Sequence, residues 1–348
     1  MALTRSDLTG KVQTVTGLID PDDLGQVLMH EHLFIDLTPP HLAQEDMRHE
    51  PLDICNCFRA RYGQEFFSDE FRIESEDIVV AELTEMKKAG GRTVVDLTVG
   101  GLGPRPAMLR SVSERTGLPI IMGSGHYVNA YQDAANAERS AESFAEEITG
   151  QILDGAWGDS ARAGIIGEIG CQTPWTDQEK RVMEGALAAQ AATGAALNVH
   201  PGRMKDQPQE VAAFCAARGA PMDRVILSHI DRTIFDEDTL FRLADTGVVI
   251  EYDLFGWETT YYWPNPDIDL PNDGVRLQWL RKLIARGHLD QILISHDICT
   301  KGRLERFGGH GFQHIFANVL PLMRRRGFTE AEISRIMVDT PRRLLTFA

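Results

Sequence analysis

Two histidines separated by one residue offer the first chemistry in this sequence. His30 and His32 lie in the stretch Leu-Met-His-Glu-His-Leu, at the end of a strongly apolar run. In an extended strand, residues i and i+2 point to the same side, so both imidazoles would project into one cavity. This spacing suits a pair of metal ligands, although two structural histidines would show the same pattern.

Four more residues of the metal-binding type end other apolar runs. They are Glu168, His200, His229 and Asp297. If the runs are parallel strands of one barrel, their carboxyl ends meet at one mouth, where catalytic residues usually lie. Four imidazoles and two carboxylates are ligands that zinc, manganese and similar divalent ions accept, and six ligands are too many for one ion. The set therefore predicts a site for two metals.

The elements that must position these side chains alternate along the chain. Apolar, β-branched runs predict strands, and the amphipathic segments between most of them predict helices. The predicted strands cover residues 26–29, 92–98, 118–123, 164–169, 195–200, 224–229, 247–253 and 291–296. The predicted helices cover residues 75–89, 105–116, 141–153, 177–192, 207–217, 238–245, 272–286 and 330–337.

Eight strand and helix units predict a (β/α)8 barrel, and 348 residues suit one such domain spanning residues 1–348. Residues 12–15 should begin a β-hairpin before the first barrel strand. Residues 37–74 are too many for an ordinary connection, so we expect a long insertion after strand 1, folded over the mouth. Residues 257–273, rich in aromatics and proline, are expected to form either a substrate wall or a loop packed on itself.

Composition excludes several classes of partner. The formal net charge of −16 argues against nucleic acid and anionic membranes, which attract clusters of lysine and arginine. No apolar stretch approaches the roughly 20 residues of a membrane span. Five scattered cysteines, and a start without the apolar core of a signal peptide, predict a reduced cytoplasmic protein. The expected ligand is a small molecule.

Ordered motifs along nearly the whole chain resemble the phosphotriesterase-related branch of the amidohydrolase superfamily. They are Val12-Gln-Thr-Val-Thr-Gly17, His30-Glu-His32-Leu, Gly164-Ile-Ile-Gly-Glu-Ile-Gly170, Asn198-Val-His-Pro-Gly-Arg203, Ser228-His-Ile-Asp-Arg-Thr233, Ser295-His-Asp-Ile-Cys299 and Asp339-Thr-Pro-Arg-Arg-Leu-Leu345. The resemblance implies that His30, His32 and Asp297 hold a buried metal and that His200 and His229 hold a more exposed one. It also implies a bridging role for Glu168 and a possible homodimer.

The bridging residue separates branches of this family. Founding phosphotriesterases use a carboxylated lysine, whereas this chain has Glu168, as in the phosphotriesterase-related subgroup. The two metals, most readily zinc but also manganese, cobalt or iron, would share a water and lower its pKa toward neutrality. The resulting hydroxide would attack the substrate, and Asp297 is the candidate to accept its proton.

Four further residues are candidates around this centre. Arg203 could bind a carboxylate, sulfonate or phosphate of the substrate, because guanidinium binds planar anions through two N–H groups. Tyr127 could contact a substrate oxygen, and Lys301 would add positive charge at the mouth. Asp231, two residues after His229, could orient one of the metal ligands.

The predicted function is metal-dependent hydrolysis of a small ester, lactone or amide, with an anionic substrate favoured if Arg203 and Lys301 face the site. One alternative is a phosphotriester hydrolase acting on organophosphates. A second is a non-catalytic protein that binds a small molecule on the same barrel, and a third, disfavoured by the bridging position of Glu168, is a mononuclear deaminase-like barrel.

Overall fold

A central set of eight parallel strands organises the molecule. The computed structural model describes residues 2–42 and 46–348. Strands β3, β8 and β9 form one parallel sheet, and β10 to β14 follow in sequence order in a second. Each overlaps one predicted strand. Their bounds are β3 Val27–Glu31, β8 Thr93–Asp96, β9 Ile120–Met122, β10 Ile166–Gly170, β11 Leu197–His200, β12 Val225–Leu227, β13 Val249–Tyr252 and β14 Ile292–Ile294.

The two sheets meet at both pairs of edges. Between β9 and β10, the backbone N–H of Gly164 donates to the carbonyl of Met122 at 2.9 Å, and that of Gly167 donates to the carbonyl of Ser124 at 2.7 Å. Between β14 and β3, the backbone N–H of Asp297 donates to the carbonyl of His30 at 3.0 Å. The strands are thus arranged around a common interior, as the alternation of their side chains also indicates.

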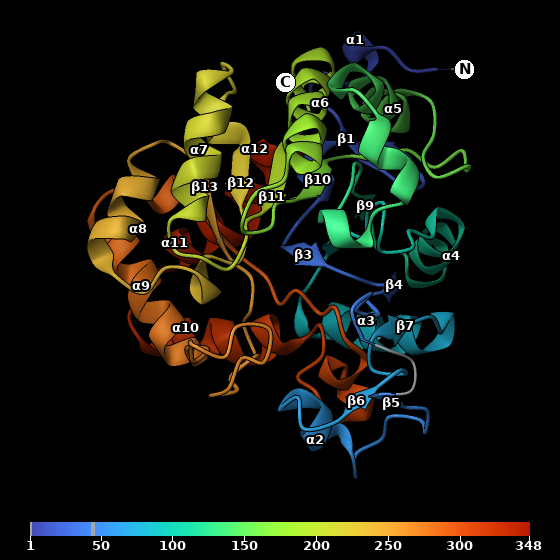
Figure 1. Ribbon diagram of the computed structural model, residues 1–348. Helices are drawn as coiled ribbons and strands as arrows, with labels where there is room; N and C mark the ends of the chain where they lie inside the picture. Colours follow the sequence, from blue (N-terminus) through green and yellow to red (C-terminus); the bar gives the residue numbers. More distant parts are fainter. Residues whose placement is uncertain (1, 43–45) are drawn as a thin grey trace.

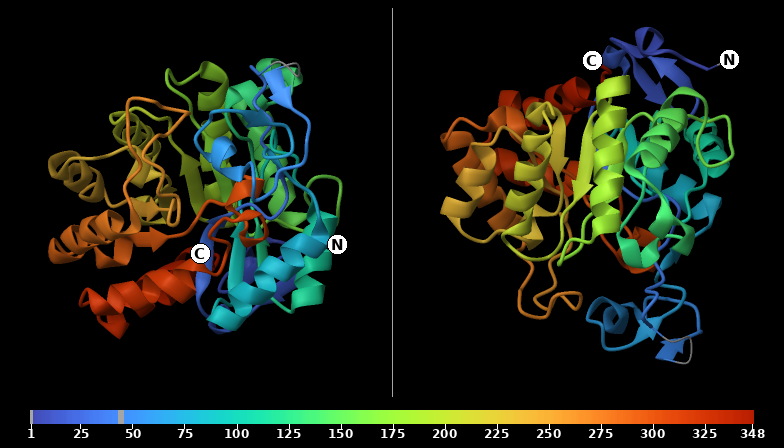
Figure 2. Two further views of the ribbon diagram at one scale, coloured as in Figure 1. Left: turned by 90° about the horizontal axis from the view of Figure 1, so that it is seen from below. Right: turned by 45° about the horizontal axis from the view of Figure 1, so that its top comes forward.

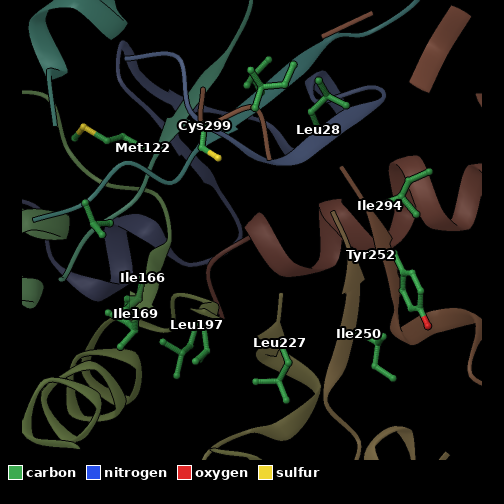
Figure 3. Packing of buried hydrophobic residues seen from close by; sticks show 14 of the residues in the cluster. Leu28, Met122, Ile166, Ile169, Leu197, Leu227, Ile250, Tyr252, Ile294 and Cys299 are labelled. Carbon is green, nitrogen blue, oxygen red and sulfur yellow. The ribbon is translucent and has the colours of Figure 1, made fainter. Parts of the chain in front are cut away.

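Side chains alternate between an inner and an outer cluster. The inner cluster takes a residue from every strand or from the position just before it: Val27, Val95, Ile121, Ile165, Ala196, Ile226, Val249 and Leu293. Their sequence neighbours join the larger outer cluster, and Figure 3 shows several of them, including Leu28, Leu197 and Ile250, spread around the strands. Both faces of each strand are therefore buried, which explains why the strands are near-continuous apolar runs in the sequence.

Helices pack around these strands (Figure 1). Ser75 caps α3 and Thr176 caps α6, each accepting a hydrogen bond from a backbone N–H of the first turn, as N-cap residues do. The helices after successive strands are α3 Glu76–Ala89, α4 Pro106–Thr116, α5 Ala141–Leu153, α6 Asp177–Thr193, α7 Gln207–Ala217, α8 Glu237–Ala244 and α9 Asp273–Ala285. Helices α10 Leu320–Arg325, α11 Glu330–Ser334 and α12 Thr340–Leu345 complete the chain, with wider helical turns at Ile315–Val319 and Arg335–Asp339.

The two ends of the molecule differ. A hairpin of β1 Val12–Thr14 and β2 Gly17–Ile19 lies at the end that holds both termini, as the pattern at residues 12–15 predicts. At the opposite end lie short elements from the segment 37–74, whose residues 43–45 are outside the described part: β5 Met47–Arg48, α2 Cys57–Arg61 and β6 Phe66–Phe67 (Figures 1 and 2). The loop 257–273 reaches the same end (Figure 2), where its Trp263 packs on Phe66 with ring centroids 5.4 Å apart.

Within the described residues, no helix has both the length and the apolar character that crossing a membrane requires.

Candidate active site

Strand alternation sets the inward direction of side chains at the ends of β11 and β14. On β11, Ala196 belongs to the inner cluster, so Asn198 and His200 point inward from the same face of the strand. On β14, Leu293 is likewise an inner residue, and Ser295 and Asp297 follow at intervals of two. The floor of the interior is therefore apolar, and its upper layers are polar.

Two other strands bring their ligands inward through a shift in register. On β3, Met29 is an inner residue, so regular alternation would turn His30 outward, but the pairing of β3 with β8 shifts between Leu28 and Glu31. On β10, Ile165 is inner, and the pairing with β11 shifts between Ile166 and Ile169. An extra residue in one strand reverses the direction of the side chains that follow. The shifts thereby turn His30 and Glu168 into the interior.

Glycine makes the β10 shift possible. Gly167 has φ of 107°, a value that residues with a side chain rarely adopt. A Cβ at this position would also lie 2.1 Å from the carbonyl oxygen of Asn198. The residue before Glu168 can therefore be nothing larger than glycine.

Two ligand candidates just beyond the ends of their strands have left-handed backbone. His229 has φ of 58° and Asp297 has φ of 49°, which are uncommon for residues other than glycine and recur at functional sites. Both carboxylate oxygens of Asp253 accept from the backbone N–H of His229, at 3.0 and 3.1 Å, and the guanidinium of Arg303 donates to the carbonyl of Asp297. These bonds hold the strained turns in place.

The six predicted ligands form two groups of donor atoms that share Glu168. In the first group, Asp297 Oδ1 lies 3.2 Å from His32 Nε2 and 3.8 Å from His30 Nε2. Glu168 faces the same two imidazoles, with Oε1 3.3 Å from His32 Nε2 and Oε2 3.6 Å from His30 Nε2. One carboxylate therefore contacts the first group and also reaches the second.

The second group contains two histidines. His200 Nδ1 lies 2.8 Å from both Glu168 Oε2 and His229 Nε2, and the latter two atoms are 3.4 Å apart. All six residues are at most 8 % exposed. Both groups, His30 with His32 and Asp297, and Glu168 with His200 and His229, could hold a metal ion.

The donor atoms fit divalent cations. A tetrahedral zinc ion with ligands at about 2.0–2.1 Å separates its ligand atoms by roughly 3.3–3.4 Å, close to most of these distances. His30 Nε2 is buried and has no hydrogen-bond partner among the described residues. A buried polar atom without a partner is costly, and a cation between the two groups would satisfy it.

A surrounding layer of hydrogen bonds orients the imidazoles. His32 Nδ1 lies 2.9 Å from Thr98 Oγ1, and His229 Nδ1 lies 2.8 Å from Asp253 Oδ1. His30 Nδ1 lies 3.2 Å from the hydroxyl of Ser228 and 3.3 Å from Asp253 Oδ2. Such contacts fix the tautomer that leaves the other ring nitrogen free to ligate, which is the usual arrangement around metal-binding histidines.

The protonation of the site reflects an excess of carboxylates. Burial disfavours charge on His30 and on His32, but the facing carboxylates outweigh burial and raise the pKa of His32 to about 9 and that of His30 well above its ordinary value. Burial alone would raise the pKa of Glu168, yet His200 and His30 hold it well below its usual range. The carboxylates thus stabilise positive charge at this centre, which divalent cations could supply.

A cavity of about 730 Å³ opens onto the second group of donors. His200, His229 and Asp297 line it from below, and aromatic side chains of both the 37–74 segment and the 257–273 loop line it above, including Phe66, Trp257 and Trp263. The loop 257–273 therefore contributes a wall of this cavity and also packs on itself, with the ring centroids of Trp257 and Tyr262 5.3 Å apart. The volume suits a small molecule.

Two of the predicted substrate contacts lie in this cavity and a third does not. Tyr127 lines it with its hydroxyl 3.4 Å from His200 Nε2, and Arg203 lines it with Nε donating to the Tyr262 hydroxyl at 3.2 Å. Lys301 is absent from its lining and instead pairs with Asp69, beside the ring of Phe307. A basic residue four positions after Asp297 is carried past the mouth because the chain turns at Lys301–Arg303.

Asp231 does not orient a ligand histidine. Its carboxylate accepts from Arg276 Nε at 2.7 Å and from the backbone N–H of Leu254 at 3.1 Å. The neighbouring Arg232 does not pair with Asp231 and turns toward His200 and Pro201. The role predicted for Asp231 falls to Asp253, because the left-handed turn at His229 directs the following residues away from the imidazole.

Sequence reasoning did not single out Asp253, Thr98 and Glu251. All three are buried polar residues. Glu251 and Asp253 stand two apart at the end of a predicted strand, which is the same parity signal that His30 and His32 give. Thr98 closes the predicted strand 92–98 and carries no comparable signal, because threonine is common in strands.

Fold and site together define an α/β protein with a buried histidine and carboxylate centre beneath a cavity. A family model described as the phosphotriesterase family matches residues 10–345, so this chain belongs to that family and is a hydrolase. It is 40 % identical over 347 residues to N-acetyltaurine hydrolase of Rattus norvegicus and 39 % identical to that of Bos taurus. Each match covers 98 % of this chain and 99 % of the relative.

A solved structure gives the same result for the fold. The crystal structure of a resiniferatoxin-binding protein from Rhodobacter sphaeroides superposes with a TM-score of 0.92 at 32 % sequence identity. The match covers 99 % of this chain and 98 % of that chain.

Proposed function

We propose that this protein is a binuclear metal-dependent hydrolase that cleaves the amide bond of a small N-acylated compound. The observation that carries the proposal is the placement of Glu168 between two groups of donors, with His30 Nε2 left without a partner among residues 2–42 and 46–348. The proposal of an amide, rather than an ester or a lactone, rests on relatives 38–40 % identical over nearly the whole chain that are named N-acetyltaurine hydrolase.

The resident metals, for which zinc is our first choice ahead of manganese, cobalt and iron, would be held by the two donor groups. His30, His32 and Asp297 would hold one, His200 and His229 the other, and Glu168 both. When bound, the pair would lower the pKa of a shared water and polarise the carbonyl of the substrate.

The chain's own residues would then position the reactants and move a proton. Asp297 lines the cavity; its Oδ1 faces His30 and His32, and its Oδ2 lies 3.9 Å from His229 Nδ1. This second oxygen would accept the proton of the attacking water and return it to the nitrogen that leaves when the amide bond breaks. Burial raises and the nearby histidines lower the pKa of Asp297, and the net shift is downward, so the carboxylate is ready to accept.

Tyr127 and Arg203, which line the cavity, would hold the substrate. Burial raises the pKa of Tyr127 well above its ordinary value, so its hydroxyl stays protonated and can donate to a substrate oxygen. Asp253 and Thr98 would act through His229 and His32 as positioning residues.

We also infer that the eight strands close into a (β/α)8 barrel within one domain, residues 1–348, and that residues 37–74 are an insertion over its mouth. The hydrogen bonds at both pairs of sheet edges support closure, and the shared cavity lining supports the position of the insertion. All five cysteines are unpaired, which fits the reducing cytoplasm.

Hydrolysis of lactones or phosphotriesters and simple ligand binding are the competing functions. The test is metal analysis of the purified protein together with hydrolysis of N-acetyltaurine, a γ-lactone and a paraoxon-like triester. We expect about two equivalents of zinc per chain, preference for the amide, and loss of turnover in His229→Ala and Asp297→Asn. A preference for either other substrate, or tight binding of an intact ligand by metal-free protein, would contradict the proposal.

A further inference from the structure

The substrate cavity contains two arginines that have no acidic partner among the described residues. Arg203 and Arg232 both line it. Among the described residues, neither guanidinium has a carboxylate within ion-pairing distance, whereas Arg276 nearby pairs with Asp231 and with Asp273. A buried guanidinium is normally paired, because leaving its charge without a counter-ion is costly.

Arg232 is the more unusual of the two. It is 2 % exposed, and its Nη1 is buried and has no hydrogen-bond partner in the part of the chain that the structure describes. Its Nη2 lies 3.1 Å from the carbonyl of Pro201 and 3.3 Å from His200 Nε2. His200 Nδ1 faces Glu168 and His229, so Nδ1 is the nitrogen that would bind a cation. In the neutral ring the proton is then on Nε2, and Nε2 cannot accept a hydrogen bond from Arg232.

The surroundings of Arg203 point the same way. Its Nε is held by the Tyr262 hydroxyl, and its guanidinium lies 6.0 Å from the centroid of that ring. Among the described residues, these contacts fix the Arg203 side chain and engage one of its five N–H groups, the one on Nε. The carboxylate that lines the cavity within the described chain is Asp297, which belongs to the candidate metal centre.

We propose that Arg203 and Arg232 form a subsite for the acidic group of the substrate, so that the enzyme acts on N-acyl amino sulfonates or N-acyl amino carboxylates. This inference rests on the proposed amide hydrolysis. The scissile carbonyl would lie over His200, His229 and Asp297, and the anion would lie beside Arg232, which contacts His200. In a chain of net charge −16, two unpaired cations in one cavity select an anion from among the possible small molecules.

The first experiment compares three acetamides of similar size. N-acetyltaurine carries a sulfonate, N-acetyl-β-alanine a carboxylate, and N-propylacetamide no charge. For the wild type we expect kcat/KM to be higher for one or both anions than for the neutral amide, and the ratio between the two anions identifies the preferred group. In Arg232→Met and Arg203→Met we expect kcat/KM for the preferred anion to fall about 10- to 100-fold, the usual effect of losing a hydrogen bond to a charged group.

The neutral amide is the control within each variant, and its kcat/KM should change by less than threefold. Lys301→Met is the control for charge, because Lys301 is a cation outside the cavity, and all three substrates should keep their wild-type rates. An equal fall for charged and neutral substrates in Arg232→Met would show that the residue acts only through His200, and would overturn the proposal.

A second measurement does not depend on turnover. Calorimetric titration of the metal-loaded wild type with butane-1-sulfonate should detect binding that Arg232→Met weakens about tenfold or more. If the wild type binds the sulfonate through Arg232 but cleaves no amide, the amidase proposal fails and the anion subsite stands. If it cleaves all three amides at similar rates and binds no sulfonate, the subsite fails and the amidase proposal stands.

Discussion

Replacing Asp253 by asparagine isolates the contact that orients His229. The carboxylate accepts from His229 Nδ1 at 2.8 Å and from the His229 backbone N–H at 3.0 Å, and it lies 3.3 Å from His30 Nδ1. Asparagine has nearly the same shape but one acceptor oxygen, and its amide N–H₂ would face a donor. At least one of these hydrogen bonds to a charged group is therefore lost, at a cost of about 1.5–3 kcal/mol.

The expected effect is a loss of metal affinity with little change in fold. That cost corresponds to about 10- to 100-fold weaker zinc binding, the usual range for residues that orient a metal-binding histidine. Affinity is measured by competition with a chromophoric chelator at fixed pH, and the melting temperature is recorded for the metal-free protein. Asp253→Asn should weaken zinc binding in the folded fraction, and its metal-free melting temperature should also fall because the same carboxylate accepts from His229 without metal.

Asp231→Asn is the matched control. Asp231 is also a fully buried carboxylate close to His229 in sequence, but it pairs with Arg276. Removing one partner of a buried ion pair costs about 3–5 kcal/mol, so this variant should melt at a lower temperature while its folded fraction keeps wild-type zinc affinity. If Asp231→Asn weakened zinc binding as much as Asp253→Asn, the assignment of the orienting role to Asp253 would be refuted.

Three further changes have defined outcomes. Thr98→Val removes the hydroxyl 2.9 Å from His32 Nδ1 and should weaken binding of one zinc equivalent about tenfold. The chelator titration should then show two steps, one for each zinc ion. Prolonged treatment with a chelator should abolish hydrolysis, and zinc should restore it; activity that survives complete metal removal would contradict the binuclear centre. Burial raises the pKa of Glu70 to about 7, so folding favours its protonated form, and the stability of the wild type should fall as the pH rises from 4.5 through 7. This pKa shift corresponds to about 3 kcal/mol. The free energy of unfolding of Glu70→Gln, measured in urea, should therefore rise by about that much relative to that of the wild type between pH 5 and pH 8. A difference between the two proteins that stays constant over this range would contradict the prediction.

The sequence predicts strands and helices well here because each strand is buried on both faces and each helix is amphipathic. The inward direction of Asn198 and His200, and of Ser295 and Asp297, follows directly from the alternation of side chains along a strand. The inward direction of His30 and Glu168 does not, because it depends on register shifts that only the pairing of neighbouring strands defines. The sequence places these residues in the site because they lie near the ends of apolar runs, whereas the inward turn of each side chain depends on the register shift.

Residues beyond the strand ends were harder to place. Lys301 and Asp231 follow ligand candidates closely in sequence, yet the turns at Lys301–Arg303 and Ile230–Arg232 point them toward Asp69 and Arg276. Short turns change direction within two or three residues, so proximity in sequence does not imply a shared cavity. Arg203 lies in a longer loop after β11 and lines the cavity, where its Nε donates to the Tyr262 hydroxyl.

The register shifts on β3 and β10 separate two tasks within one strand. Below each shift the residues fill the apolar interior, and above it they face the candidate metals, so the floor can change in volume without rotating the ligands. Conversely, deletion of a single residue at either shift would restore regular alternation and bury His30 or Glu168 against the helices. Point substitutions in the cavity walls are thus a far safer route to new substrates in this protein than any change in strand length.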